Sequence, residues 1–385
     1  MGWLQSLVLC TLAACCVARS PPQPFLNPLP QQAQNPSPLV SRGCNDSNVL
    51  TFAGFALQDI NREQKDGYVL SLNRVHDVWE EYQDDIGTLF YLTLDVLETG
   101  CHVLSKKAWK DCDVRTLHTS VYGQCKAMFY INKPGRVLYT PAYNCTLRPV
   151  SRRKIHTMCP DCPSPTNLSD PEVLEAVTES LAKFNSESPS KQYSLIKITK
   201  ASSQWVVGPA YFVEYLIKES PCTKSQESCS LQSLNSVSVG LCEGSLTKTP
   251  EDKFVTVSCD FFESQVQVPA SENTDATQGP PILPEAEDPS KKKLSAFPIP
   301  RGSVQHLPDL DDEKAKDPQE KDPQEAFPVQ LDLTTDPQGT TVDVSFLFMG
   351  PEEKKLRVLP FPKKEQHSTQ CPSPAKHTSP LILPP

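Results

Sequence analysis

The segment Cys159-Pro160-Asp161-Cys162-Pro163 sets a carboxylate between two cysteines that are only three positions apart. A disulfide between such cysteines closes so small a ring that the enclosed residues bulge outward, and the flanking prolines stiffen the backbone. From this exposed ring, the carboxylate of Asp161 could occupy the open coordination position of a catalytic zinc ion in another protein. The ring could equally be only a rigid strut between two domains.

Two other kinds of chemistry are disfavoured at this segment. A redox Cys-x-x-Cys motif normally precedes a helix, which Pro163-Ser164-Pro165 prevents from starting directly. His156 stands three positions before Cys159, a spacing typical of zinc ligands, but oxidised cysteines cannot bind a metal. We find no nucleophile elbow, phosphate-binding glycine loop or His-Glu-x-x-His motif in the chain, and we expect neither enzymatic activity nor a cofactor.

The composition of the 385-residue chain outlines its domains. Seven prolines fall in residues 21–43 and twenty in the last 120 residues, so both ends are too rich in proline to form a core. The apolar run from Trp3 to Val17 predicts a secretory signal peptide, because it is too short to span a bilayer. The predicted parts are a signal peptide at 1–20 without an assigned cleavage site, a proline-rich segment at 21–43, a domain at 44–150, a linker at 151–165, a second domain at 166–262 and a largely disordered tail at 263–385.

The cysteines agree with export from the cell. Of fifteen, three lie in the presumed signal peptide, and the even number that is left predicts disulfides. The Asn-x-Ser/Thr sequences at Asn45, Asn144 and Asn167 predict glycosylation. The net charge of −9 argues against a nucleic-acid partner. We therefore expect a secreted, extracellular, monomeric glycoprotein with no membrane partner.

Residues 44–145 and 170–259 repeat one pattern. Four cysteines of the first unit correspond, in the same order, to four of the second: Cys101, Cys112, Cys125 and Cys145 to Cys222, Cys229, Cys242 and Cys259. Each unit begins with a helical pattern, capped by Asp46 or Ser47 in the first and by Asp170 in the second. The predicted apolar faces are Leu50, Ala53, Leu57 and Ile60, widened by Phe52 and Phe55, and Val173, Val177, Leu181 and Phe184.

After each helix the apolar period falls to two, which predicts strands. The predicted strands are 68–75, 89–96, 124–131, 137–143, 193–198, 211–217 and 253–259. One helix followed by antiparallel strands predicts an α+β unit in which the helix covers one face of the sheet. In the tail, 329–333 and 341–348 alternate in the same way and could form a further hairpin or equally be an apolar segment in a coil.

Each unit has a hairpin loop that begins with glutamine and ends with glycine. The second loop consists of Gln204, Trp205, Val206, Val207 and Gly208. The first loop runs from Gln83 to Gly87, with Asp85 at the position of Val206. The two loops therefore cannot bind the same apolar cleft equally well.

A Gln-x-Val-x-Gly hairpin after a long helix, with two disulfides downstream, resembles the cystatin family. Two such units joined by Cys-Pro-Asp-Cys-Pro and followed by a proline-rich tail with one last cysteine resemble the fetuins, over essentially the whole chain. This resemblance implies two tandem cystatin-like domains. It also implies the disulfides Cys44–Cys371, Cys101–Cys112, Cys125–Cys145, Cys159–Cys162, Cys222–Cys229 and Cys242–Cys259.

The resemblance also implies inhibition of zinc metalloproteases of the astacin family. The expected target is the egg enzyme ovastacin, whose inhibition prevents premature hardening of the zona pellucida and so supports fertilisation. In this interpretation Asp161 binds the catalytic zinc and displaces its water, while the rest of the 159–163 ring and loop 204–208 fill the cleft.

Two other functions stay open. The first is inhibition of cysteine proteases through loop 204–208. It is weakened because Thr249-Pro250-Glu251 stands where the second cystatin hairpin has Pro-Trp. The second is a mineral or ligand carrier like the related fetuin-A, for which the first unit offers an acidic cluster. That cluster consists of Glu80, Glu81, Asp84 and Asp85.

Overall fold

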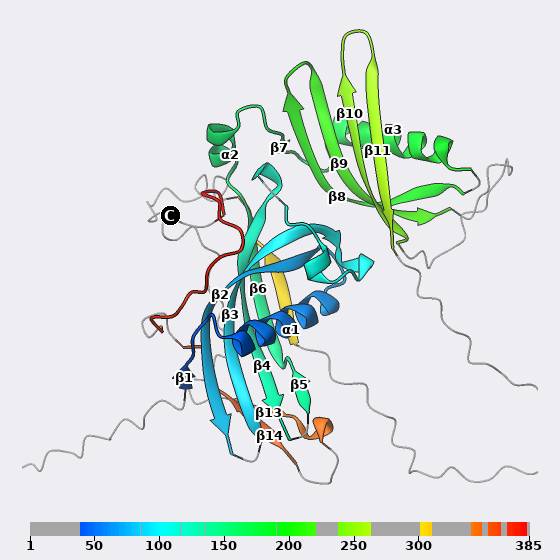
Figure 1. Ribbon diagram of the computed structural model, residues 1–385. Helices are drawn as coiled ribbons and strands as arrows, with labels where there is room; N and C mark the ends of the chain where they lie inside the picture. Colours follow the sequence, from blue (N-terminus) through cyan, green and yellow to red (C-terminus); the bar gives the residue numbers. More distant parts are fainter. Residues whose placement is uncertain are drawn as a thin grey trace, which may run out of the picture. The chain divides into compact units, whose positions relative to one another are not determined.

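The computed structural model describes two α+β domains and several segments of the tail (Figure 1). The described residues are 39–84, 86–115, 117–134, 136–189, 191–220, 238–262, 301–309, 340–348, 353–362 and 368–382. The expected signal peptide and most of the proline-rich segment 21–43 lie outside this range. No helix within it is long and apolar enough to cross a membrane.

The first domain packs helix α1, Ser47–Glu63, across a seven-stranded sheet (Figure 1). The carboxylate of Asp46 caps the helix by accepting a hydrogen bond from the main-chain nitrogen of Asn48 at 2.7 Å. The sheet has the order β1-β2-β3-β4-β6-β12, and β5 pairs with β4. Its strands are β1 Leu39–Ser41, β2 Tyr68–Gln83, β3 Gly87–His102, β4 Val121–Asn132, β5 Val137–Tyr139, β6 Ala142–Pro149 and β12 Arg301–His306.

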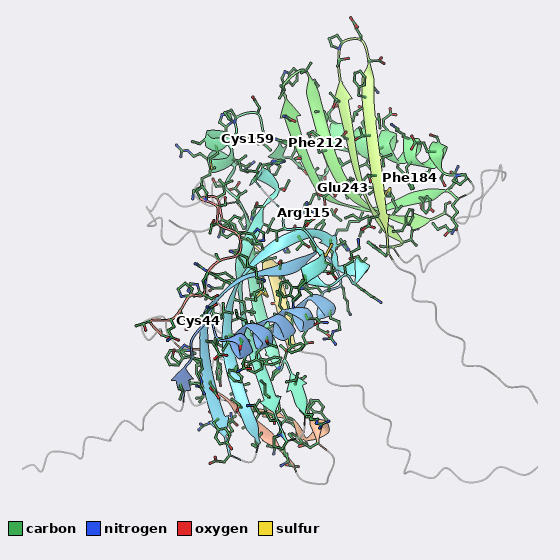
Figure 2. All side chains as sticks on the ribbon, in the orientation of Figure 1. Cys44, Arg115, Cys159, Phe184, Phe212 and Glu243 are labelled. Carbon is green, nitrogen blue, oxygen red and sulfur yellow. A yellow bond between two sulfur atoms is a disulfide. The ribbon has the colours of Figure 1, made fainter. Side chains whose placement is uncertain are left out.

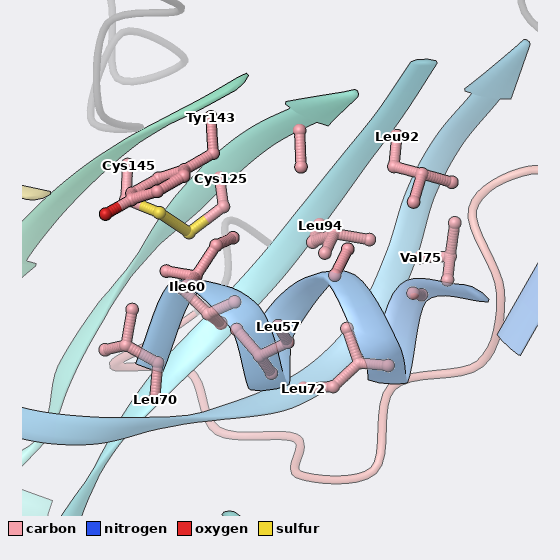
Figure 3. Close-up of a cluster of buried hydrophobic side chains, with 14 of the residues drawn as sticks. Leu57, Ile60, Leu70, Leu72, Val75, Leu92, Leu94, Cys125, Tyr143 and Cys145 are labelled. Carbon is pink, nitrogen blue, oxygen red and sulfur yellow. A yellow bond between two sulfur atoms is a disulfide. The ribbon is translucent and has the colours of Figure 1, made fainter. Parts of the chain in front are cut away.

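The core of this domain lies between α1 and the sheet (Figure 3). Leu57 and Ile60 are fully buried there, beside the Cys125–Cys145 disulfide. The predicted helix face was partly wrong, because Leu50 and Phe55 are 37% and 42% exposed. Val49 and Ala56 are buried in their place, which turns the apolar stripe slightly around the helix axis. Three short 3₁₀ helices connect β3 to β4: η1 Val103–Ser105, η2 Trp109–Asp111 and η3 Leu117–Thr119.

The second domain repeats this arrangement with helix α3, Pro171–Glu187, on a five-stranded sheet (Figure 1). Asp170 caps the helix through the main-chain nitrogen of Glu172, at 2.9 Å, and Pro171 takes the first helical position. The sheet has the order β11-β10-β9-β8-β7. Its strands are β7 Ser164–Pro165, β8 Tyr193–Trp205, β9 Pro209–Glu219, β10 Gly240–Lys248 and β11 Lys253–Phe261.

The described tail segments pack on the first domain. Strand β12 extends its sheet by pairing in parallel with β6, and the Cys44–Cys371 disulfide joins the tail to the start of the domain. A two-stranded sheet of β13, Thr340–Asp343, and β14, Lys355–Val358, buries apolar side chains against the sheet face opposite α1. A 3₁₀ helix, η5 Ser345–Leu347, follows β13. Strand β13 thus pairs with β14, whereas 329–333, the other half of the predicted tail hairpin, lies outside the described residues.

Several elements differ from the sequence prediction. A helix, α2 Arg152–Met158, occupies the linker, and strand β10 was not predicted. The predicted strand 137–143 is interrupted between β5 and β6. Pro141 lies in this interruption, and proline cannot donate a ladder hydrogen bond.

Candidate functional site

The ring at residues 159–163 begins directly after helix α2 (Figure 2). The main-chain nitrogen of Cys159 donates to the carbonyl oxygen of Ile155 at 2.7 Å, and that of Cys162 donates to the carbonyl of Cys159 at 3.1 Å. The Cys159–Cys162 disulfide closes the turn, with the two Cα atoms 5.3 Å apart. Pro160 and Asp161 are exposed at its tip, which places the carboxylate in solvent as the small ring predicts.

The base of the ring rests on packed side chains. Cys162 contacts a buried cluster that includes Ile155 of α2 and two residues near the end of the chain, Leu381 and Ile382. No group of three or more metal-ligating side chains occurs among the described residues. The disulfide also leaves His156 without thiolate neighbours.

After the ring, the chain becomes an edge strand of the second domain. Ser164 and Pro165 form β7, which pairs with Ser203 and Ser202 of β8. The main-chain nitrogen of Thr166 continues this pairing with the carbonyl oxygen of Ala201 at 3.1 Å. Strand β8 leads directly into loop 204–208, so the pairing holds the ring beside that loop. Two-residue strands have no recognisable period, and the sequence did not predict this connection.

Loop 204–208 contacts the ring through its first residue. The side-chain nitrogen Nε2 of Gln204 donates a hydrogen bond to the main-chain carbonyl oxygen of Asp161. The bond uses the backbone of Asp161 and leaves its carboxylate free. The three residues that follow are exposed although they are apolar: Trp205 is 77% exposed, Val206 56% and Val207 84%. Apolar side chains gathered at an exposed tip mark a contact surface for another molecule.

Gly208 brings a second loop next to this tip. A Cβ atom at Gly208 would lie 2.2 Å from the carbonyl oxygen of Lys248, so only glycine allows this approach. Lys248 is the last residue of β10, and the turn that follows is closed by a 2.9 Å hydrogen bond from the nitrogen of Thr249 to the carbonyl of Asp252. The ring, loop 204–208 and turn 249–252 therefore form a three-part edge, which we call the exposed edge.

The corresponding loop of the first domain is occupied by the tail. The amide of Gln83 donates to the carbonyl of Arg357 at 2.5 Å and accepts from the nitrogen of Arg357 at 2.9 Å. Arg357 also pairs with the buried carboxylate of Glu81 at 2.9 Å, and the nitrogen of Leu359 donates to the hydroxyl of Tyr91 at 2.7 Å. Asp85 lies outside the described residues. Strand β14 thus binds the side chains of Glu81 and Gln83, which precede the turn of this hairpin.

The remaining expected site residues are distributed as follows. Besides the ring disulfide, the described residues contain Cys44–Cys371, Cys101–Cys112, Cys125–Cys145 and Cys242–Cys259. Cys222 and Cys229 lie outside them. Asn45 and Asn167 are exposed, and Asn144, which is half-buried, accepts a 3.2 Å hydrogen bond from Ser303 of β12. The acidic cluster does not form a solvated face, because Glu81 is buried and Glu80 pairs with Arg42.

A buried charged cluster joins side chains that are far apart in the sequence. Both terminal nitrogens of Arg115 contact the carboxylate of Glu214, at 2.8 and 2.6 Å, and the hydroxyl of Tyr68 donates to the same carboxylate at 2.6 Å. Burial opposes ionisation of Glu214, but the hydrogen bonds and charge of Arg115 outweigh it and hold the pKa of Glu214 below its ordinary value. Glu98 and Lys200 form a further ion pair in this cluster. No pattern in the sequence indicates these partners.

Comparisons with known proteins agree with this architecture. The cystatin domain profile matches residues 40–133 and 161–251. Fetuin-B of Mus musculus is 65% identical over 394 residues, with 100% of both chains covered. Mouse fetuin-B in complex with crayfish astacin is similar with a TM-score of 0.69 and 58% identity, covering 91% of this chain and 98% of that one. The inhibitory complex of human meprin beta with mouse fetuin-B gives a TM-score of 0.71 and 62% identity, covering 89% and 99%.

Proposed function

This chain belongs to the fetuin-B family, and from that premise we propose that it inhibits zinc metalloproteases of the astacin family. The observation that carries the proposal is that mouse fetuin-B, similar along nearly its whole length, forms an inhibitory complex with meprin beta and a complex with astacin. Its action is accordingly inhibition of enzymes and not catalysis. Family membership also supports secretion, and ovastacin is the expected physiological target.

Asp161 is the proposed ligand of the target's zinc. It is exposed at the tip of a ring whose backbone is fixed by a disulfide, a turn hydrogen bond and Gln204. In metalloproteases the zinc-bound water is the nucleophile, so a carboxylate in its place removes the reagent itself. A fixed ring loses little conformational entropy on binding, which favours tight association.

The ring is also proposed to resist cleavage. A protease needs an extended substrate, whereas the Cys162-to-Cys159 hydrogen bond keeps this backbone in a turn. If a bond inside the ring were cut, the disulfide would hold the new ends together. Loop 204–208 of the exposed edge supplies apolar contacts beside the zinc, through Trp205, Val206 and Val207.

Inhibition of cysteine proteases through loop 204–208 is a weaker alternative. In this loop the amide of Gln204 is already bound to Asp161, and the second turn has Thr249, Pro250 and Glu251 in place of Pro-Trp. The ring itself stands where a cystatin has a free N-terminal arm. A carrier role is weaker too, because the acidic cluster that it requires is partly buried.

One panel of assays tests the proposed function. The purified glycoprotein is titrated against an astacin-type protease and against papain under the same conditions. We expect inhibition of the first alone. Inhibition of papain alone would favour the hairpin mechanism, and inactivity against both enzymes would favour the carrier role.

A further inference from the structure

A cavity of about 340 Å³ lies beside α1, and no residue of the exposed edge lines it. Its walls include Leu50 and Phe55 of α1, Leu72 of β2 and Trp109 of η2. Leu50 and Phe55 are the two residues of the expected apolar helix face that are exposed, and the cavity accounts for their exposure. A mostly apolar hollow of this size is typical of small-molecule sites.

Two lysines stand at the same wall of the cavity. The Nζ atoms of Lys110 and Lys376 lie 5.4 and 4.7 Å from the ring centroid of Trp109. Neither ammonium group forms an ion pair with any residue that the structure describes. Partial burial and the charge of Lys110 lower the pKa of Lys376. Two neighbouring positive charges without a counterion repel each other, and a bound anion would relieve that repulsion.

The lysine from the tail is held in place by its backbone. The nitrogen of Lys376 donates to the carbonyl of Asn73 at 3.0 Å, and the nitrogen of His377 donates to the Asn73 side-chain oxygen at 2.8 Å. The Asn73 amide in turn donates to the carbonyl of His377 at 3.2 Å. These three bonds fix the tail across β2 and place a cation at the rim of an apolar hollow.

We propose that this cavity binds a small amphiphilic anion, with its acidic group between Lys110 and Lys376 and its apolar body against Trp109, Phe55 and Leu50. The acidic group pairs with both lysines, which have no ion-pair partner within the described part of the chain. The apolar body covers side chains that otherwise face water, which is favourable in proportion to the area buried. The alternative is that the cavity binds no ligand and that the two lysines only pack their apolar stems on the indole ring.

Three probes with the same twelve-carbon chain separate these possibilities. The delipidated full-length protein is titrated by calorimetry with dodecanoate, dodecanol and dodecylammonium. Because charge-assisted hydrogen bonds are markedly stronger than neutral ones, we expect dodecanoate to bind at least roughly tenfold more tightly than dodecanol. The dodecylammonium cation is expected to bind most weakly.

Two variants locate the site. In the double variant Lys110→Gln, Lys376→Gln, the preference for dodecanoate over dodecanol should disappear. The matched control, Lys65→Gln with Lys133→Gln, removes two exposed lysines that do not line the cavity and should keep the preference. Gly54→Leu fills the hollow, because a Cβ atom at Gly54 lies 3.7 Å from Trp109, in ordinary contact, and the side chain continues into the cavity. It should weaken dodecanoate and dodecanol alike, by roughly tenfold or more, since the apolar burial is lost.

The proposal is overturned if the parent protein shows no preference for dodecanoate, or if the double variant keeps that preference. Inhibition of an astacin-type protease should be the same in every variant, because the cavity lies outside the exposed edge. This second assay confirms correct folding and separates the result from the proposed inhibitory function.

Discussion

The side-chain amide of Gln204 donates its hydrogen bond to the main-chain carbonyl of Asp161, so the first residue of the hairpin loop fixes the tip of the ring. The corresponding Gln83 binds the main chain of Arg357 in the tail. Equivalent glutamines of the two repeats therefore bind other segments of this chain. We therefore propose that Gln204 positions the ring, in addition to the target contact expected from its motif.

Asp161 is predicted to carry the inhibition. Asp161→Asn keeps the shape of the side chain but replaces an anionic zinc ligand with a poorer neutral one. Because the metal–carboxylate interaction is worth several kcal/mol, the inhibition constant for an astacin-type protease should rise by at least about two orders of magnitude. The control Asp84→Asn removes an exposed carboxylate from the first hairpin and should leave inhibition unchanged. Equal inhibition by Asp161→Asn and the parent would rule out the zinc-ligand mechanism.

Loss of the Gln204 contact should weaken inhibition without unfolding the protein. Gln204→Ala removes one hydrogen bond, worth about 1 kcal/mol, and frees the ring tip, so we expect inhibition to weaken by up to about tenfold. Gln83→Ala is the matched control, since it breaks the equivalent contact at the first hairpin and should not change inhibition. Equal loss in both variants would mean that the effect comes from general destabilisation and not from the ring.

Opening the ring should turn an inhibitor into a substrate. Cys159→Ser with Cys162→Ser removes the closure but keeps Asp161 and both prolines. The free segment can become extended, so we expect weaker inhibition and cleavage near residues 159–163 during incubation with the protease. Mass spectrometry of the products checks this outcome. An intact segment after long incubation would show that β7 pairing and the Gln204 contact protect the chain without the disulfide.

The Arg115–Glu214 pair should make stability depend on pH. Arg115→Met leaves a buried carboxylate without its main partner, which should cost about 3 kcal/mol at pH 7. Because Arg115 lowers the pKa of Glu214, this stabilisation is complete above the unfolded pKa of about 4.3 and is lost as the pH falls through the lower folded pKa. The free energy of unfolding in urea should therefore fall less between pH 7 and pH 3 in Arg115→Met than in the parent.

Glu243→Gln is the control for that experiment. Glu243 lies on the neighbouring strand β10, where partial desolvation and the charge of Glu214 raise its pKa. Removing its charge should change the free energy of unfolding at pH 7 by no more than about 0.5 kcal/mol. A large loss of stability in Glu243→Gln would mean that substitutions on this sheet are destabilising in general. The result for Arg115→Met could then not be attributed to the Arg115–Glu214 pair.

Local features of the fold were predictable from the sequence. Asp46 and Asp170 cap their helices because a short acidic side chain can reach the free main-chain nitrogens of the first turn. The exposure of Asp161 was predictable as well, because a disulfide between Cys159 and Cys162 closes a ring too small to enclose the residues between them. Each of these predictions needs only residues that are close together in the chain.

Features that depend on distant partners were not predictable. Arg115 and Glu214 are 99 positions apart, and Gln83 and Arg357 are 274 apart, so no period or spacing connects them. The exposure of Leu50 and Phe55 depends on Trp109 and Lys376, which form a cavity beside the helix. Periodicity shows which face of a helix is apolar, but it does not show how far the neighbouring elements shield each residue of that face from solvent.

The Cys44–Cys371 disulfide gives the protein the connectivity of a closed loop. Any single backbone cut between residues 45 and 370 leaves two polypeptides that this bond still joins. An inhibitor that meets proteases can therefore be nicked in its tail and circulate as one covalent particle of unchanged mass, apart from the water added by hydrolysis. Electrophoresis would show one band without reductant and two with it.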